Sequence, residues 1–100
     1  MKEKHMEKGS LSDGTYRIRG LKAYSIGMRE NLLTIEMKNK NGTVTALELR
    51  GIIAFTDKGT AGKSLSEFTI EDKGSFRILS IFRPNGNRVF VCEFLVCQAV

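Results

Sequence analysis

From Thr15 onward, apolar and polar residues alternate with a period of two, and β-branched and aromatic residues recur between glycines. This pattern is typical of half-buried β-strands, and no window shows the i, i+3, i+4, i+7 apolar spacing of a helix. The pattern predicts strands near residues 15–19, 21–29, 32–39, 43–50, 51–56, 65–71, 75–83 and 87–98. Seven to eight short antiparallel strands joined largely by hairpins indicate an all-β fold, either a small meander barrel or a two-layer sandwich.

Three predicted turns, at residues 39–42, 71–74 and 83–86, end in glycine and fit three-residue hairpin loops. In the first hairpin this loop sets Ile35 opposite Leu47, whereas a two-residue loop would set Ile35 opposite Glu48. Because a one-residue slip moves every side chain to the other face, the first register is favoured. The three loops together predict the pairs Ile35–Leu47, Leu33–Leu49, Ile70–Phe76, Phe68–Ile78, Phe76–Phe94, Ile78–Cys92 and Arg77–Glu93.

These registers define a core face and a second apolar face. The predicted core is Phe68, Ile70, Phe76, Ile78, Phe82, Phe90, Cys92, Phe94 and Val96, joined by Ile18, Leu33, Ile35, Leu47, Leu49, Ile53 and Phe55. The opposite face of the last two strands carries Leu79, Ile81, Val89, Val91 and Leu95. A strand that is apolar on both faces is either central in a layered fold or covered by a partner.

The chain has 100 residues, of which 41% are hydrophobic and 27% charged, as expected for one globular domain. Residues 14–100 are predicted to form a single all-β domain, and residues 1–13 a disordered or cloning-derived tail, in which Met6 would be the native start and residues 1–5 a cloning remnant. Charged residues interrupt every apolar stretch, and no secretory signal is visible. We therefore expect a cytoplasmic protein without a membrane span.

The residues available for catalysis are few. The only histidine is His5, in the predicted tail, so a Ser/His/Asp or Cys/His arrangement is not expected. Cys92 and Cys97 would point to opposite faces of one strand, roughly 16 Å apart, which is too far for a disulfide. We predict that they are small buried hydrophobes, that the acidic residues face water, and that the protein is not an enzyme and binds neither metal nor cofactor.

Residues 57–64 read Asp-Lys-Gly-Thr-Ala-Gly-Lys-Ser after an apolar strand, which resembles a Walker A phosphate loop. In such a loop Lys63 would reach the phosphates and Ser64 would ligate Mg²⁺. However, Asp57 stands where the pattern requires glycine, and the next residues alternate as a strand instead of forming a helix. We interpret the segment as a surface loop, with an anion-binding nest as the alternative, formed by Gly59, Gly62, Lys63 and Ser64.

A formal net charge of +5 suits an anionic partner. The candidate polyanion patch consists of Arg17, Arg19, Lys22, Arg29, Lys38 and Lys40. Tyr16 and Tyr24 are candidate stacking surfaces for single-stranded nucleic acid. The alternative is a solvated face whose basic residues deter aggregation of edge strands.

Our leading functional hypothesis is a non-enzymatic protein-interaction or assembly module, with a protein partner or a second copy of the chain. The candidate self-association stripe in the apolar C-terminal strand is Val89, Val91, Leu95 and Cys97, which a homodimer would bury. One alternative is a basic β-barrel that binds nucleic acid or another polyanion. A further alternative is a small-ligand carrier, which the phenylalanine-rich interior disfavours.

Overall fold

The protein is described by a computed structural model, which defines the backbone of residues 3–4, 9–38 and 41–100 and the side chains of residues 9–17, 26–38 and 41–100. These described residues form ten strands: β1 (Glu3–Lys4), β2 (Gly9–Ser10), β3 (Gly14–Arg29), β4 (Leu32–Lys38), β5 (Val44–Arg50), β6 (Ala54–Asp57), β7 (Ser64–Asp72), β8 (Arg77–Phe82), β9 (Arg88–Phe94) and β10 (Val96–Ala99). The predicted all-β class is confirmed. The described ranges contain no helix, and hence none that could cross a membrane.

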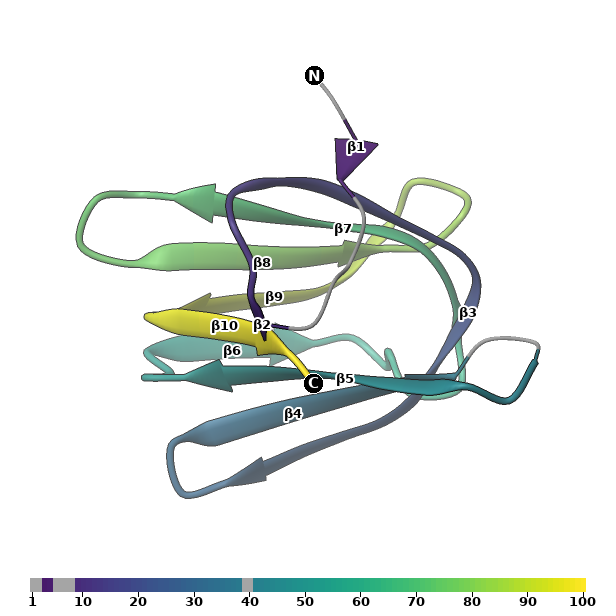
Figure 1. Ribbon diagram of the computed structural model, residues 1–100, viewed down its shortest axis with the longest axis horizontal. Coiled ribbons are helices and arrows are strands. Elements are labelled where there is room, and N and C mark those ends of the chain that lie inside the picture. The colour runs from purple at the N-terminus through teal and green to yellow at the C-terminus, as the bar shows by residue number, and fades with distance from the viewer. Residues whose placement is uncertain (1–2, 5–8, 39–40) are drawn as a thin grey trace.

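Two five-stranded antiparallel sheets lie face to face and share β3 (Figure 1). The first sheet has the order β2-β10-β5-β4-β3, and the second has the order β3-β7-β8-β9-β6. β3 pairs with β7 through its first half and with β4 through its second half, so it passes from one layer to the other. The sheets are not closed into a barrel, which agrees with the sandwich of the two predicted architectures.

The two predicted strands 15–19 and 21–29 are one long strand, β3. Its register with β7 shifts between Arg17 and Leu21, which is where the sequence suggested a break. The predicted strand 87–98 is instead two strands, β9 and β10, which separate at Leu95.

The register of the first hairpin and the turn of the third are as predicted, while residues 39–40 of the first turn lie outside the described residues. Ile35 pairs with Leu47 and Leu33 with Leu49, as expected. At the β8–β9 turn, the Arg83 N–H donates to the Asn87 carbonyl at 2.9 Å, and Gly86 has φ of 86°. A type I turn followed by a left-handed glycine accounts for this three-residue loop.

The predicted middle hairpin is wrong. The Lys73 N–H donates to the Phe76 carbonyl at 2.9 Å, so Gly74 and Ser75 form a two-residue loop in which Gly74 has φ of 93°. Glycine at the first central position is the signature of a type II′ turn. The resulting pairs are Ile70–Leu79 and Phe68–Ile81 in place of Ile70–Phe76 and Phe68–Ile78.

The predicted β8–β9 register is also wrong, because β9 contains a bulge. Phe82 pairs with Arg88 but Ile81 pairs with Phe90, so Val89 is an extra residue in β9. Beyond the bulge the pairs are Leu79–Cys92, Ile78–Glu93 and Arg77–Phe94. Each of the two errors reverses the face on which side chains lie, so β7 and β9 keep their predicted core faces and only β8 has the opposite face in the core. Leu79 and Ile81 are therefore buried, whereas Phe76, Ile78 and Phe82 are half-buried.

The buried core joins residues of both sheets. Its apolar members are Leu11, Tyr16, Leu33, Ile35, Met37, Leu47, Leu49, Leu65, Phe68, Ile70, Leu79, Ile81, Val89, Phe90, Cys92, Phe94, Cys97 and Ala99. Phe90 and Phe94 are buried as predicted, whereas Ile53, Phe55 and Val96 were expected in the core and are exposed. Ile18 lies outside the described side chains.

Residues 9–13 belong to the fold, contrary to the predicted tail boundary. The Leu11 side chain is buried, and its N–H donates to the Cys97 carbonyl at 3.1 Å. The Arg77 guanidinium donates to the Leu11 carbonyl at 2.8 Å and to Asp13 Oδ1 at 3.0 Å. These bonds fasten the segment to both sheets, and residues 1–8 lie outside the described side chains.

Candidate functional site

β6 forms a free end of the second sheet. Within the described part of the chain it pairs with β9 alone, from Ala54–Glu93 to Asp57–Phe90. The Lys58 N–H donates to the Val89 carbonyl at 2.8 Å. Since alternate residues of an antiparallel pair bond to the neighbouring strand, Phe55 and Asp57 direct their backbone N–H and C=O groups away from β9. All four residues of β6 are exposed.

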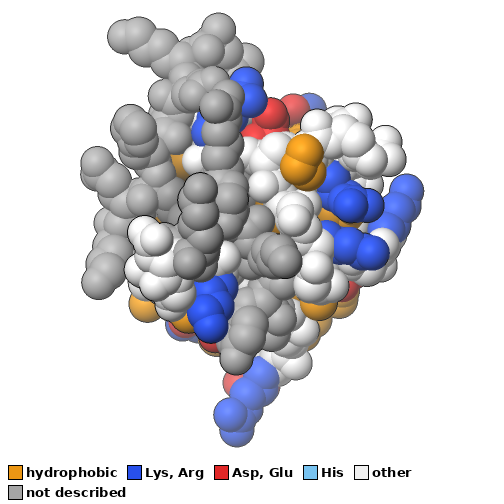
Figure 2. Space-filling model, turned by 90° about the vertical axis from the view of Figure 1, so that its right-hand side faces the viewer, with side chains coloured by type: hydrophobic (Ala, Val, Ile, Leu, Met, Phe, Trp, Pro, Cys, Tyr) orange, Lys and Arg blue, Asp and Glu red, His pale blue; other side chains and the backbone are white. Residues whose placement is uncertain are grey.

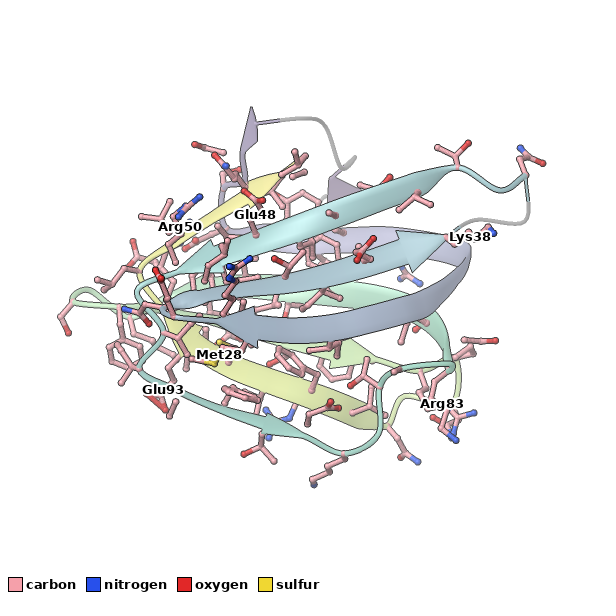
Figure 3. The ribbon with its side chains drawn as sticks, turned by 90° about the horizontal axis from the view of Figure 1, so that it is seen from below. Met28, Lys38, Glu48, Arg50, Arg83 and Glu93 are labelled. Atoms are coloured by element: carbon pink, nitrogen blue, oxygen red, sulfur yellow. The ribbon has the colours of Figure 1, made fainter. Side chains whose placement is uncertain are left out.

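In the described structure a second free edge runs along the end of β3. Pairing with β7 stops at Lys22, while pairing with β4 continues to Arg29. Figure 3 shows β6 as the outermost strand of its sheet, on the side of the molecule that the free edge of β3 also faces. Met28, near the end of β3, lies on the side of that strand that faces β6. We call these two edges, residues 54–57 and 23–29, the open margin.

Apolar side chains at the open margin remain in contact with water. The exposed fractions of Met28, Ile53 and Phe55 are 48%, 56% and 42%. The Phe55 ring lies 6.2 Å from the ring of buried Phe90, which places it on the core side of β6. An additional strand at the margin would cover this apolar surface.

Basic side chains near the open margin differ from those elsewhere in lacking an acidic partner. Four other cations are paired, as Arg17–Glu67 (3.7 Å), Arg50–Glu48 (3.9 Å), Lys73–Glu71 (3.5 Å) and Arg77–Asp13 (3.0 Å). Among the described residues, no ion pair forms at Arg29, Lys58, Lys63, Arg83 or Arg88. Figure 2 looks at the right-hand end of Figure 1, where Lys and Arg side chains gather and few acidic ones are visible. Arg83 is labelled at this end in Figure 3.

A shallow pocket of about 170 Å³ lies between β6 and β9. Its lining includes Thr56 of β6, Lys58 directly after β6, and Arg88 and Val91 of β9. Two cations and a hydroxyl group therefore surround one small space. Such a pocket can hold a carboxylate or another small anionic group by charge-assisted hydrogen bonds.

The loop that follows β6 is folded around Asp57. Its Oδ1 accepts hydrogen bonds from the Gly59 N–H (3.0 Å), the Thr60 N–H (2.8 Å) and the Thr60 hydroxyl (2.7 Å). The Thr60 side chain is fully buried, with Oγ1 3.2 Å from the carbonyl oxygen of Val89, the bulged residue of β9. Asp57, the residue that breaks the Walker A pattern, is thus the centre of the loop.

The candidate anion nest has little free donor capacity in the described structure. The Gly59 N–H is used by Asp57, and the Lys63 N–H donates to the Thr60 carbonyl at 3.1 Å. Ser64 begins β7 and not a helix, so no helix N-terminus faces the loop. Gly62 has φ of 81° and, like Lys63, is exposed.

The three described members of the candidate polyanion patch lie at separate positions along β3 and β4. Arg17 is paired with Glu67 on the second sheet, whereas Arg29 ends β3 and Lys38 ends β4 in the first. The side chains of Arg19, Lys22 and Lys40 lie outside those described, as does that of Tyr24. Tyr16 is buried, with its ring stacked 4.7 Å from that of Phe68, so it offers no stacking surface to a ligand.

The four residues of the candidate self-association stripe are not together on the surface. Val89 and Cys97 are buried, Val91 is half-buried, and Leu95 is 51% exposed. β9 lies between β8 and β6, and β10 lies between β5 and β2, so neither is an edge strand.

The two cysteines are free and buried. They do not point to opposite faces of one strand, because the chain bends at Leu95 and both side chains enter the core. Burial raises the pKa of each thiol to about 12; for Cys92 the neighbouring Cys97 and Glu93 add to the shift, and for Cys97 Arg77 offsets it in part. Both thiols are therefore neutral at physiological pH.

The open margin was not foreseen from the sequence, which placed Ile53 and Phe55 in the core. An alternating strand has the same pattern at the centre and at the edge of a sheet, so the pattern could not show which strand is last. No model of a known protein family matches the chain, and no curated protein or solved structure is significantly similar to it.

Proposed function

We propose that this domain is a non-enzymatic protein-interaction module that accepts an extended segment of a partner protein as an additional strand at the open margin. The observation that carries the proposal is the free edge of β6, whose four residues, Phe55 among them, are all exposed, together with exposed Met28 on the free edge of β3. Strand addition obtains affinity from main-chain hydrogen bonds and specificity from alternate side chains.

β6 has few of the features that usually keep an edge strand from pairing with another chain. Natural edge strands are shortened, charged, bulged or interrupted by proline. The opposite end of the strand order follows this rule, because β2 has two residues. β6 has four, with Phe55 and Thr56 at its centre and no proline. An edge of this kind is a template for pairing with another chain.

The other functional hypotheses have less support from the geometry. A ligand carrier needs an interior space, and the described interior side chains, among them Phe68, Phe90 and Phe94, pack into one apolar cluster between the sheets. A nucleic-acid binder of the stacking type needs several exposed aromatic rings, but among the described side chains Tyr16 is buried and only the ring of Phe55 is exposed. The unpaired cations alone suit a polyanion, so the experiments below include one.

The test uses a displayed library of random peptides of about eight residues, a common strand length. We expect selected peptides to bind the wild-type protein and to protect the amide protons of Phe55 and Asp57 from exchange. Phe55→Ala removes the ring and should weaken binding about tenfold. Phe55→Pro also removes the outward N–H and should abolish it, while the melting temperature of both variants shows that they are folded.

A second arm does not depend on the variants. Two versions of a selected peptide are methylated on alternate backbone nitrogens, one at the odd and one at the even positions. Only one version should lose binding, since only one set of N–H groups faces β6. Equal binding of both methylated peptides, or selected peptides that leave the β6 amides unprotected, would contradict the proposed function.

A further inference from the structure

We infer that the partner strand is acidic on the side that faces solvent, opposite Thr56 and Lys58, and apolar on the side that faces the core. This inference rests on the proposed function and adds the side-chain pattern that the margin recognises.

The inward half of the pattern follows from the alternation of β6. Successive side chains of a strand point to opposite faces, and Phe55 is on the core side, near Phe90. Directly opposite residues on neighbouring strands have Cβ atoms about 5 Å apart. An inward residue of the added strand would therefore pack on Phe55 and, across the opening, toward Met28, where an apolar side chain fits.

The outward half follows from the charges on the other face. Thr56 and Lys58 line the 170 Å³ pocket together with Arg88, and no described carboxylate pairs with Lys58 or Arg88. A residue of the added strand opposite Thr56 or Lys58 reaches this pocket from its open side. A glutamate or aspartate there would provide the missing negative charge.

The acidic residues of the domain near β6 determine the position along this strand at which an acidic side chain of the partner is favourable. Half-buried Glu93 pairs with Ala54, at the start of β6, and repels a second carboxylate there. Asp57 is on the core side like Phe55, and its Oδ1 is occupied by three loop donors. The favourable position for a carboxylate is therefore toward the Lys58 end of β6 and not toward the Ala54 end.

The surroundings of Arg83 strengthen the positive potential at this end. Arg83 starts the turn into β9, next to Phe82, which pairs with Arg88. Its Nε is buried without a hydrogen-bond partner among the described atoms. A carboxylate bound nearby would interact with this charge as well as with Lys58 and Arg88.

The experiment measures fluorescence anisotropy with three labelled peptides of about eight residues. One alternates valine and glutamate, one valine and lysine, and one threonine and glutamate. We expect the valine–glutamate peptide to bind at least about tenfold more tightly than either of the others, because each of these lacks one half of the pattern. A single-stranded oligonucleotide tests whether negative charge alone is sufficient.

Charge-reversal variants locate the acid. Lys58→Glu and Arg88→Glu should each weaken the valine–glutamate peptide about fivefold and strengthen the valine–lysine peptide. Lys73→Glu is the matched control, because Lys73 is an exposed cation that already has Glu71 as its partner. It makes the same change in net charge and should alter binding less than twofold.

The possible outcomes separate the inference from the proposed function. If the valine–lysine peptide binds as well as the valine–glutamate peptide and both protect Phe55, strand addition is correct and the acidic pattern is wrong. If no peptide protects Phe55, both fail. If the threonine–glutamate peptide or the oligonucleotide binds as tightly as the valine–glutamate peptide, the site is a polyanion surface and the inference is overturned.

Discussion

Replacing Leu79 by alanine tests the unexpected orientation of β8. Leu79 is fully buried and pairs with Ile70 on one side and Cys92 on the other, both of them core residues. Truncation of a buried leucine costs about 3–5 kcal/mol, because transfer free energy is lost and a cavity remains. A domain of this size has a total stability of about 5–15 kcal/mol, so the melting temperature should fall by roughly 15 °C or more.

The matched variant is Ile78→Ala on the neighbouring residue. Ile78 is half-buried and lies between Glu71 and Glu93 on the outer face, so its truncation should cost about 1 kcal/mol. Ile78→Thr retains the β-branched side chain and separates burial from strand propensity. Urea unfolding, monitored by far-UV circular dichroism, gives the free energy of unfolding of each variant, and an unchanged m-value shows that the difference is one of stability. A larger loss for Ile78→Ala than for Leu79→Ala would refute the described register.

Three further predictions concern the loop after β6, the turn between β3 and β4, and the two thiols. Asp57→Ala should destabilise the protein by about 1–3 kcal/mol in urea unfolding, because three donors lose their acceptor, whereas Asp57→Asn retains an acceptor and should cost less than half as much. Glu30 has φ of 56°, so Glu30→Asn should raise the stability by about 0.5–1 kcal/mol in the same assay; unchanged stability would mean that the turn is not strained. The pKa values of Cys92 and Cys97 are raised to about 12, so the folded state retains protons that the unfolded state loses above its ordinary thiol pKa near 9. Stability should therefore be unaffected by these thiols below pH 9 and decline from about pH 9 to pH 12, a decline that a Cys92→Ala, Cys97→Ala protein should lack.

The sequence predicted those features of the fold that depend on local chemistry. The Ile35–Leu47 register followed from the requirement that both strands place their apolar residues on one face. The Gly86 turn followed from the sequence Pro-Asn-Gly. The predicted middle turn was wrong because Gly74 fits two loops, either the last position of a three-residue loop or the first position of a two-residue type II′ turn with Ser75, and the structure has the second.

The remaining features depend on tertiary packing. The bulge at Val89 has no marker such as glycine in the sequence, yet it shifts the register by one residue and so changes which side chains of β8 and β9 share a face. Its carbonyl accepts the Lys58 N–H, so the bulge and the loop after β6 stabilise each other across residues far apart in the chain. The open margin depends on strand order, which an alternating pattern does not encode. For this reason Ile53 and Phe55 were assigned to the core.

Intermolecular nuclear Overhauser effects between the protein and the valine–glutamate peptide test whether the peptide pairs with β6 as an added strand. We expect contacts between backbone protons of the peptide and those of Phe55 and Asp57, repeated every second residue as in a β-ladder. Peptide side chains on one face should contact the Phe55 ring, and those on the other face should contact Lys58. A bound peptide whose contacts lie on the β8–β9 turn or along β2, with no backbone contact to β6, would show that strand addition at β6 is wrong.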